Sequence, residues 1–289
     1  MTSIFSRVHR RLLRSWTLPA PLTSVGVAVA GRRFTAPVVD RRFGAPAEPW
    51  LIDLFRKLLG ARVGPFVDIG VNMGQTLMVV KALETGRPYI GFEPNPRCVA
   101  YCESLVALNG MENVTLVPAG LADSSGLRRL QFYGASGYDE GASIVENFRP
   151  GQAVKGEIVV AVVSADDAMK TLDIGSLAIV KIDTEGAESE ILASMRGSIA
   201  ASRPWIVTEV LPPYSAENTV RLDRQSAIEG LLRDIDYRIL RIQKSAAGRL
   251  AGLVEIDSFG VYADVAMSDY VFAPAQDVAA VVALVRRDS

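Results

Sequence analysis

Carboxylates and glycines follow two apolar segments of this chain in a pattern that could do chemistry. The segment IVKIDTEGAESEIL, residues 179–192, runs from an apolar strand into Asp183 and Glu185 and then a glycine. The segment VDIGVNMG, residues 67–74, also places a carboxylate, Asp68, in an apolar run that ends in glycines. Glycines let a backbone turn tightly and approach a ligand closely. Both segments are therefore candidates for the lining of a binding site.

Repeated units of strand and helix are expected to position these residues. The strands are expected at the apolar segments 64–70, 88–94, 114–123, 177–183 and 205–210. Helical segments lie between them, and this alternation predicts a mostly parallel sheet covered by helices on both faces. An antiparallel insertion around a glycine-rich loop is expected at about 126–163. The sequence therefore predicts an α/β fold with one interruption.

In an open parallel sheet, ligands bind beyond the carboxyl ends of the strands. The residues expected at that edge are Asp68, Gly70, Asn72 and Gly74 after the first strand, Glu93 after the second, Asp123 after the third, and Asp183 and Glu185 after the fourth. An acidic residue at the end of the second strand is placed to accept hydrogen bonds from ribose hydroxyls, which predicts a nucleoside-containing cofactor. The spacing DxGxNxG differs from the GxGxxG dinucleotide fingerprint. An acidic edge also suits a cofactor with a positive centre.

The composition is that of a soluble globular protein, with 289 residues, 49% of them hydrophobic and 22% charged. A formal net charge of −1 argues against a dedicated nucleic-acid binder. No apolar run reaches the roughly 18 residues of a membrane span, and no secretory signal is recognisable, so a cytoplasmic protein is expected. Cys98 and Cys102, four residues apart, are expected to be reduced thiols, and no metal site is predicted.

Residues 1–60 are expected to form an extension with a basic helix, a hairpin and a second helix, ahead of a main domain at 61–289. In the first 16 residues, apolar side chains recur at helical spacing and arginines take the other face. Such a helix could rest weakly on an anionic membrane surface, on the inner face of the membrane. The alternatives are a helix docked on its own domain, one docked on the second subunit of a homodimer, or a frayed tail.

Three segments resemble the FkbM family of S-adenosylmethionine-dependent methyltransferases: VDIGVNMGQT, GFEPNP and KIDTEGAESEIL. The resemblance covers roughly residues 60–275. It implies a class I methyltransferase fold, which is Rossmann-like, with a seven-stranded and mostly parallel sheet whose last strand is antiparallel. It also implies O-methylation of a hydroxyl on a sugar, a glycan or a specialised metabolite. The alternatives are a non-catalytic cofactor-binding module of the same fold and a nicotinamide oxidoreductase, which the glycine spacing disfavours.

The resemblance also implies roles for the residues at the sheet edge. It places Asp68, Gly70, Asn72 and Gly74 around the methionine part of the cofactor, Glu93 on the ribose, Asp123 near the adenine, and Asp183 and Glu185 beside the transferred methyl group and the acceptor. The only histidine, His9, lies in the basic segment at the start of the chain. A carboxylate is therefore the expected base, and the candidates are Asp183, Glu185 and Glu209.

Overall fold

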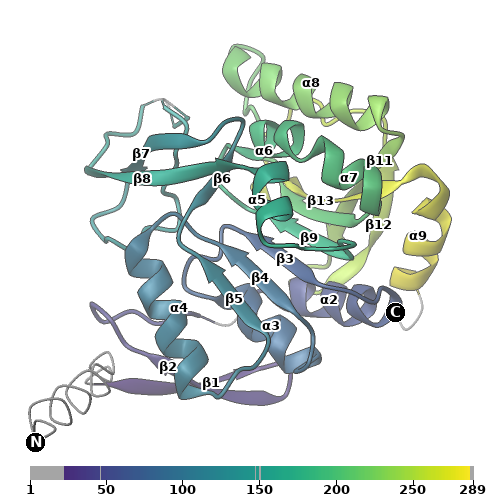
Figure 1. Cartoon of the computed structure of the whole chain (residues 1–289). Helices are drawn as coiled ribbons and strands as arrows, with labels where there is room; N and C mark the ends of the chain where they lie inside the picture. Colours follow the sequence, from purple (N-terminus) through teal and green to yellow (C-terminus); the bar gives the residue numbers. More distant parts are fainter. Residues whose placement is uncertain (1–22, 46, 147, 150, 287–289) are drawn as a thin grey trace, which may run out of the picture.

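The computed structural model describes residues 23–45, 47–146, 148–149 and 151–286, and the predicted basic helix at 1–16 lies outside them (Figure 1). In this described part, eight strands form the central sheet in the order β12-β11-β13-β10-β9-β3-β4-β5. Their bounds are β3 Phe66–Ile69, β4 Tyr89–Phe92, β5 Val114–Val117, β9 Ile179–Ile182, β10 Trp205–Glu209, β11 Tyr237–Lys244, β12 Leu250–Ile256 and β13 Asp269–Pro274.

Five neighbouring strands of this sheet, from β5 to β10, are parallel, and β13 lies antiparallel between β10 and β11. The predicted class I fold, α/β with a mostly parallel sheet, is therefore confirmed. The predicted strand number of seven is wrong, because β12 pairs with β11 and adds an antiparallel strand at the edge.

Helices cover both faces of the sheet (Figure 1). They are α2 Pro49–Ala61, α3 Gln75–Leu83, α4 Pro96–Leu108, α5 Ala165–Thr171, α6 Glu188–Ser194, α7 Arg196–Ser202, α8 Thr219–Asp234 and α9 Val278–Arg286. Successive strand residues point to opposite faces: Phe66 packs in a core with α2, α3, α4 and α9, and Val67 in a core with α5 to α8. No helix of the described residues is long and apolar enough to cross a membrane.

The predicted hairpin is formed by β1 Ser24–Val29 and β2 Arg32–Pro37, which pair antiparallel. Its turn, Ala30 and Gly31, has positive φ at both residues, as two-residue hairpin turns favour. The hairpin is fastened to the end of α4 by Asn109, whose side chain accepts from the Thr35 backbone N–H at 2.7 Å and donates to the Thr35 carbonyl at 2.9 Å. The apolar face of the hairpin therefore shares a core with α3 and α4.

A second sheet, also within the described residues, lies over the carboxyl ends of the central strands. It contains β6 Gly120–Ala122, β8 Gly156–Ser164 and β7 Gly126–Phe132, in that order. β7 pairs antiparallel with β8 in the segment where an antiparallel insertion was expected. The prediction of one strand over 114–123 is wrong: the segment breaks at Pro118, which has no backbone N–H to donate. Its first half is edge strand β5, and its second half, β6, pairs with β8.

Candidate active site

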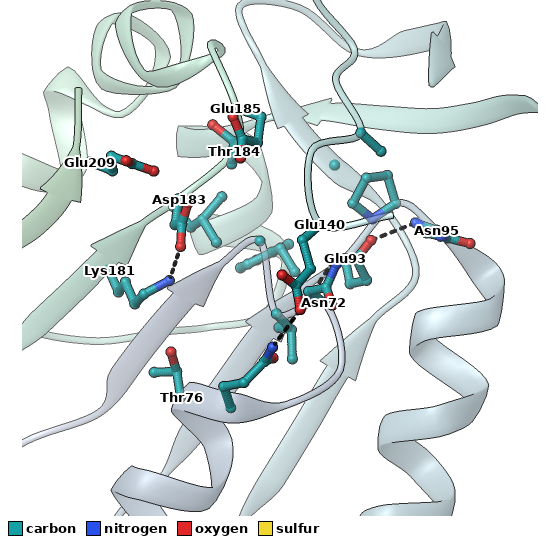
Figure 2. Close-up of a pocket in the computed structure, with 18 of the residues that line it drawn as sticks. Asn72, Thr76, Glu93, Asn95, Glu140, Lys181, Asp183, Thr184, Glu185 and Glu209 are labelled. Carbon is teal, nitrogen blue, oxygen red and sulfur yellow. Dashed lines mark hydrogen bonds and ion pairs between the residues drawn. The ribbon is translucent and has the colours of Figure 1, made fainter. Parts of the chain in front are cut away.

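A cavity of about 420 Å³, here called the first cavity, opens at the carboxyl ends of β3, β4 and β9 (Figure 2). Its volume lies within the range of roughly 300–1,000 Å³ that is usual for ligand pockets. The charged residues that line it are Glu48, Glu93, Asp139, Glu140, Asp183, Glu185, Glu209 and Lys181. Carboxylates thus outnumber cations in the described lining, and the cavity favours a ligand that carries positive charge.

The glycine turn after β3 forms one wall of the first cavity. Gly70 has a φ of +93°, and a Cβ there would lie 1.9 Å from the carbonyl oxygen of Asp183. Only glycine lets the turn lie so close to the loop after β9, and the Asp183 N–H donates to the Ile69 carbonyl at 2.9 Å. Asn72, two residues on, is left-handed with a φ of +47°, a conformation that asparagine adopts more readily than most residues. The turn and the carboxylate loop are therefore held together.

Glu93, at the end of β4, is buried and lines the first cavity. Its two carboxylate oxygens accept the backbone N–H groups of Asn72 and Asn95, each at 2.8 Å. Asn95 in turn caps α4, since its side chain accepts from the Arg97 N–H. Burial raises the pKa of Glu93 to about 7, although these two hydrogen bonds oppose the rise. A carboxylate offers about four acceptor positions, so Glu93 can still accept hydrogen bonds from hydroxyl groups of a ligand.

Lys181 joins two carboxylates at the centre of the sheet. Its ammonium group lies 2.8 Å from Asp183 Oδ2, which faces the cavity, and 3.8 Å from Asp68 Oδ1, which is fully buried. Burial alone would lower the pKa of Lys181, but the charges of Asp183 and Asp68 raise it above its usual value. Burial also raises the pKa of Asp68 to about 6, and Tyr89 donates a hydrogen bond to its other oxygen. Asp68 therefore lies behind the cavity wall and supports Asp183 through Lys181.

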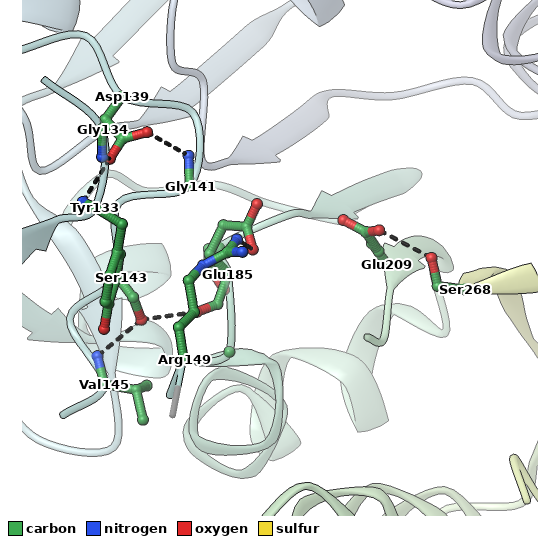
Figure 3. A network of polar contacts seen from close by, with 12 residues as sticks. Tyr133, Gly134, Asp139, Gly141, Ser143, Val145, Arg149, Glu185, Glu209 and Ser268 are labelled. Carbon is green, nitrogen blue, oxygen red and sulfur yellow. Dashed lines mark hydrogen bonds and ion pairs between the residues drawn. The ribbon is translucent and has the colours of Figure 1, made fainter. Parts of the chain in front are cut away.

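Glu185 and Glu209 face the first cavity from the ends of β9 and β10 (Figure 2). Arg149 of the insertion lies 2.5 Å from Glu185 Oε2, and Ser143 donates to the Glu185 carbonyl at 2.7 Å (Figure 3). Glu209 accepts from the Ser268 hydroxyl at 2.8 Å. Burial, followed by the charge of Asp183, raises the pKa of Glu185 to about 7 and that of Glu209 to about 8. Both groups can therefore exchange protons near neutral pH.

Two residues that the sequence placed in the site, Gly74 and Asp123, do not line the cavity. Gly74 begins α3 with a φ of +77°, and a Cβ there would meet the side chain of Leu105. Asp123 is exposed and pairs with Arg128 at 3.4 Å. The break at Pro118 moves the chain into the second sheet, so that Asp123 lies outside the first cavity. The other predicted residues, Gly70, Asn72, Glu93, Asp183, Glu185 and Glu209, all line it, and Asp68 lies directly behind it.

Sequence reasoning missed the residues that the insertion and α2 contribute. Glu140 lines the cavity, and Asp139 holds the insertion loop by accepting the backbone N–H groups of Tyr133, Gly134 and Gly141. The segment GYDEG contained a signal, since it places two carboxylates between glycines. Glu48 and Arg149 carried no such signal, because only the folded chain brings them to the strand ends.

The order of strands, with antiparallel β13 between β10 and β11, is that of the class I methyltransferase fold. The glycine turn after β3 and the carboxylate after β4 lie at the edge where such a fold binds its ligand. The methyltransferase FkbM domain matches residues 68–239, more than half of the chain, and the chain belongs to this family of methyltransferases.

Similar solved structures include a methyltransferase FkbM from Methylobacillus flagellatus, 16% identical over 72% of this chain and 43% of its own, with a TM-score of 0.42. This chain thus spans less than half the length of that protein. Precorrin-6y C5,15-methyltransferase from Geobacter metallireducens is 15% identical over 77% of this chain and 83% of its own, with a TM-score of 0.38. An O-methyltransferase from Bacillus cereus, in complex with SAH, is 10% identical over 76% of this chain and 79% of its own, with a TM-score of 0.41. No curated protein matches the chain.

The cofactor is S-adenosylmethionine, and the donor set of the first cavity fits it. Glu93 offers acceptor positions to ribose hydroxyls, and the surplus of carboxylates suits a sulfonium and an ammonium group. Apolar side chains that could pack on an adenine ring are Ile69, Val71, Phe92, Leu121, Leu130 and Ile144. Lys181, the single cation of the described lining, is paired with Asp183, so the cavity offers little to a pyrophosphate.

Replacing Glu93 by alanine should weaken binding of S-adenosylhomocysteine by about 1.5–3 kcal/mol, or roughly 10- to 150-fold. The variant loses the carboxylate that would accept hydrogen bonds from the ribose hydroxyls. It also leaves the backbone N–H groups of Asn72 and Asn95 without their hydrogen-bond acceptor. Calorimetric titration measures the change, and Glu103→Ala, at an exposed position of α4, is the matched control. Unchanged affinity in a folded Glu93 variant would refute the ribose assignment.

Proposed function

We propose that this chain is an O-methyltransferase that transfers the methyl group of S-adenosylmethionine to a hydroxyl of a sugar, a glycan or a specialised metabolite. The observation that carries the proposal is the convergence of Asp183, Glu185 and Glu209 on the first cavity. The chain has no histidine beyond His9, so these carboxylates are its candidates for accepting a hydroxyl proton. The raised pKa values of Glu185 and Glu209 suit that task, since an effective base has a pKa near the working pH.

When bound, S-adenosylmethionine would supply an electrophilic methyl group to the acceptor oxygen. The acceptor hydroxyl must also lose its proton, and a carboxylate of the first cavity can accept it. Asp183 is the first candidate, because Lys181 holds its Oδ2 at 2.8 Å and leaves Oδ1 for the hydroxyl. Glu209 is the second, since it lines the cavity at the end of the neighbouring strand β10. Holding the reacting groups in line can supply about 7–11 kcal/mol of the acceleration.

Turnover should rise with pH across the neutral range. The pKa is about 7 for Glu185 and about 8 for Glu209. At a pH below these values the two carboxyl groups are protonated and cannot take the proton of the acceptor hydroxyl. Above these values they are carboxylates, so the active form accumulates as the pH increases. Because the charges interact, the inflection belongs to the group of carboxylates rather than to one residue. Single-turnover rates between about pH 5.5 and 9.5 measure it, and a flat profile would contradict Glu185 or Glu209 as the base.

The proposed function is tested by incubating the protein with methyl-labelled S-adenosylmethionine and a set of hydroxyl-bearing glycosides. We expect a product that gains one methyl group and keeps it in alkali, because methyl ethers survive conditions that hydrolyse methyl esters. Label that is lost in alkali would indicate carboxyl methylation instead. Label on an amine would indicate N-methylation, and either result would overturn the proposal.

A further inference from the structure

A second cavity, of about 570 Å³, adjoins the first at the ends of β9 and β10. The two share the lining residues Glu48, Leu51, Lys181, Asp183 and Glu209. Residues that line only the second cavity include Trp50, Lys244, Ala246, Gly248 and Asp269. Asp183 and Glu209 therefore face both cavities, whereas Glu93 and Glu185 line only the first.

The outer wall of the second cavity is built from the start of α2 and the turn between β11 and β12. The Trp50 N–H donates to the Gly248 carbonyl at 3.0 Å. One residue further along that turn, Arg249 holds Asp53 of α2 through two hydrogen bonds of 2.7 Å. Both segments lie outside residues 68–239, the part that matches the family. This wall is therefore a feature of the chain that the family match does not cover.

The charges of the second cavity are paired and leave a surplus of carboxylates. Lys244 lies 2.5 Å from Asp269 Oδ2 and 4.5 Å from the centroid of the Trp50 ring, and Lys181 is held by Asp183. Glu48 accepts the Trp50 indole N–H at 2.6 Å. Within the described lining, four carboxylates thus face two lysines that both have carboxylate partners. A ligand must supply hydrogen-bond donors here, and a phosphate or carboxylate would be repelled.

We propose that the second cavity binds the methyl acceptor, and that the bound part is a polyhydroxylated group without negative charge, such as a neutral or amine-bearing sugar ring. The inference rests on the proposed function, because Asp183 and Glu209 connect the two cavities. Lys244 and Asp269 then determine specificity for the acceptor. They do so from outside the first cavity, so their replacement leaves cofactor binding intact.

The test uses the full chain with S-adenosylhomocysteine and three probes: a methyl hexopyranoside, its 2-amino derivative and its 6-phosphate. Saturation-transfer NMR is expected to detect the neutral or the amine-bearing probe and not the phosphate. Lys244→Met should weaken that binding by about tenfold or more, because Asp269 loses the ammonium group that holds it in place as a charged acceptor for the ligand. The affinity for S-adenosylhomocysteine should stay within about twofold, since Lys244 does not line the first cavity. Lys155→Met, at an exposed lysine of the insertion, is the matched control.

Ala246→Trp is a second variant at an exposed turn residue, where a bulky side chain would obstruct the second cavity without a buried change. Binding of the phosphate alone, binding of no probe, or unchanged binding in both variants would overturn the inference. The inference would be supported if a neutral probe binds to the wild-type protein and no longer binds to Ala246→Trp, even if the probe receives no methyl group. A bound probe that receives no methyl group would count against the proposed function, so the two failures are distinguishable.

Discussion

Replacing Asp183 by asparagine is expected to lower turnover by about 10²–10⁴, the usual scale for loss of a general acid–base group. Asp183 faces both cavities, so its free oxygen can meet the acceptor hydroxyl beside the methyl group. Asparagine keeps the shape but cannot take the proton. Most of the affinity for S-adenosylhomocysteine should remain, because Glu93 and the glycine turn are untouched. Single-turnover methyl transfer with a probe that binds is the measurement.

Asp167→Asn, at an exposed position of α5, is the matched control and should leave the rate unchanged. Glu209→Gln should also lower the rate, and the two changes should be non-additive if both carboxylates serve one proton transfer. Near-wild-type rates in both single variants would show that these carboxylates only shape the loops after β9 and β10.

Replacing Lys181 by methionine is expected to destabilise the fold by about 3–5 kcal/mol, the range for breaking a buried ion pair from one side. Lys181 is buried, and Asp68, which lies 3.8 Å from it, is fully buried with Oδ1 lacking a hydrogen-bond partner. Without the ammonium group, Asp68 would be an uncompensated charge at the centre of the sheet. Urea unfolding of the two proteins at the same pH measures the difference in the free energy of unfolding.

The loss should also depend on pH. Burial raises the pKa of Asp68 to about 6, so the native state binds the proton of Asp68 more tightly than the unfolded state does. The contribution of Asp68 to the free energy of unfolding therefore falls as the pH rises. Removing Lys181 raises that pKa further, so the loss should be larger above about pH 7 than near pH 5. Adding Asp68→Asn should restore part of the stability. A loss no greater than that of the exposed Lys170→Met control, about 0.5 kcal/mol or less, would refute the role of Lys181.

The local sequence predicted the parallel part of the fold well because each strand there is short, apolar and bounded by a turn. It also predicted that Glu93 and Asp183 would lie at one edge of the sheet, because residues at the ends of neighbouring parallel strands must meet there. The sequence did not predict that 114–123 would divide between two sheets. That outcome depends on the pairing of β6 with β8, some 40 residues along the chain.

The same limit applies to the residues that arrive from a distance. Arg149 reaches Glu185 only because the insertion folds over the strand ends. Lys244 reaches Trp50 only because the turn between β11 and β12 is bonded to the start of α2. Lys181 shows a different limit. It lies two residues before Asp183 in the sequence, but the burial of Asp68 on its other side depends on three strands lying in register.

The position of β13 between β10 and β11 has a consequence for synthesis on the ribosome. Every residue that lines the first cavity has been translated by Glu209, but β13 begins only at Asp269. Until β13 has been translated, β11 has no strand through which to pair with the rest of the sheet. The hydrogen bonds between Asp53 and Arg249 also join residues that are 196 positions apart. Closing this loop costs entropy, which its contacts can offset only after Arg249 has been translated. The lining of the first cavity can thus be translated, and begin to fold, before the outer wall of the second cavity is joined to the sheet.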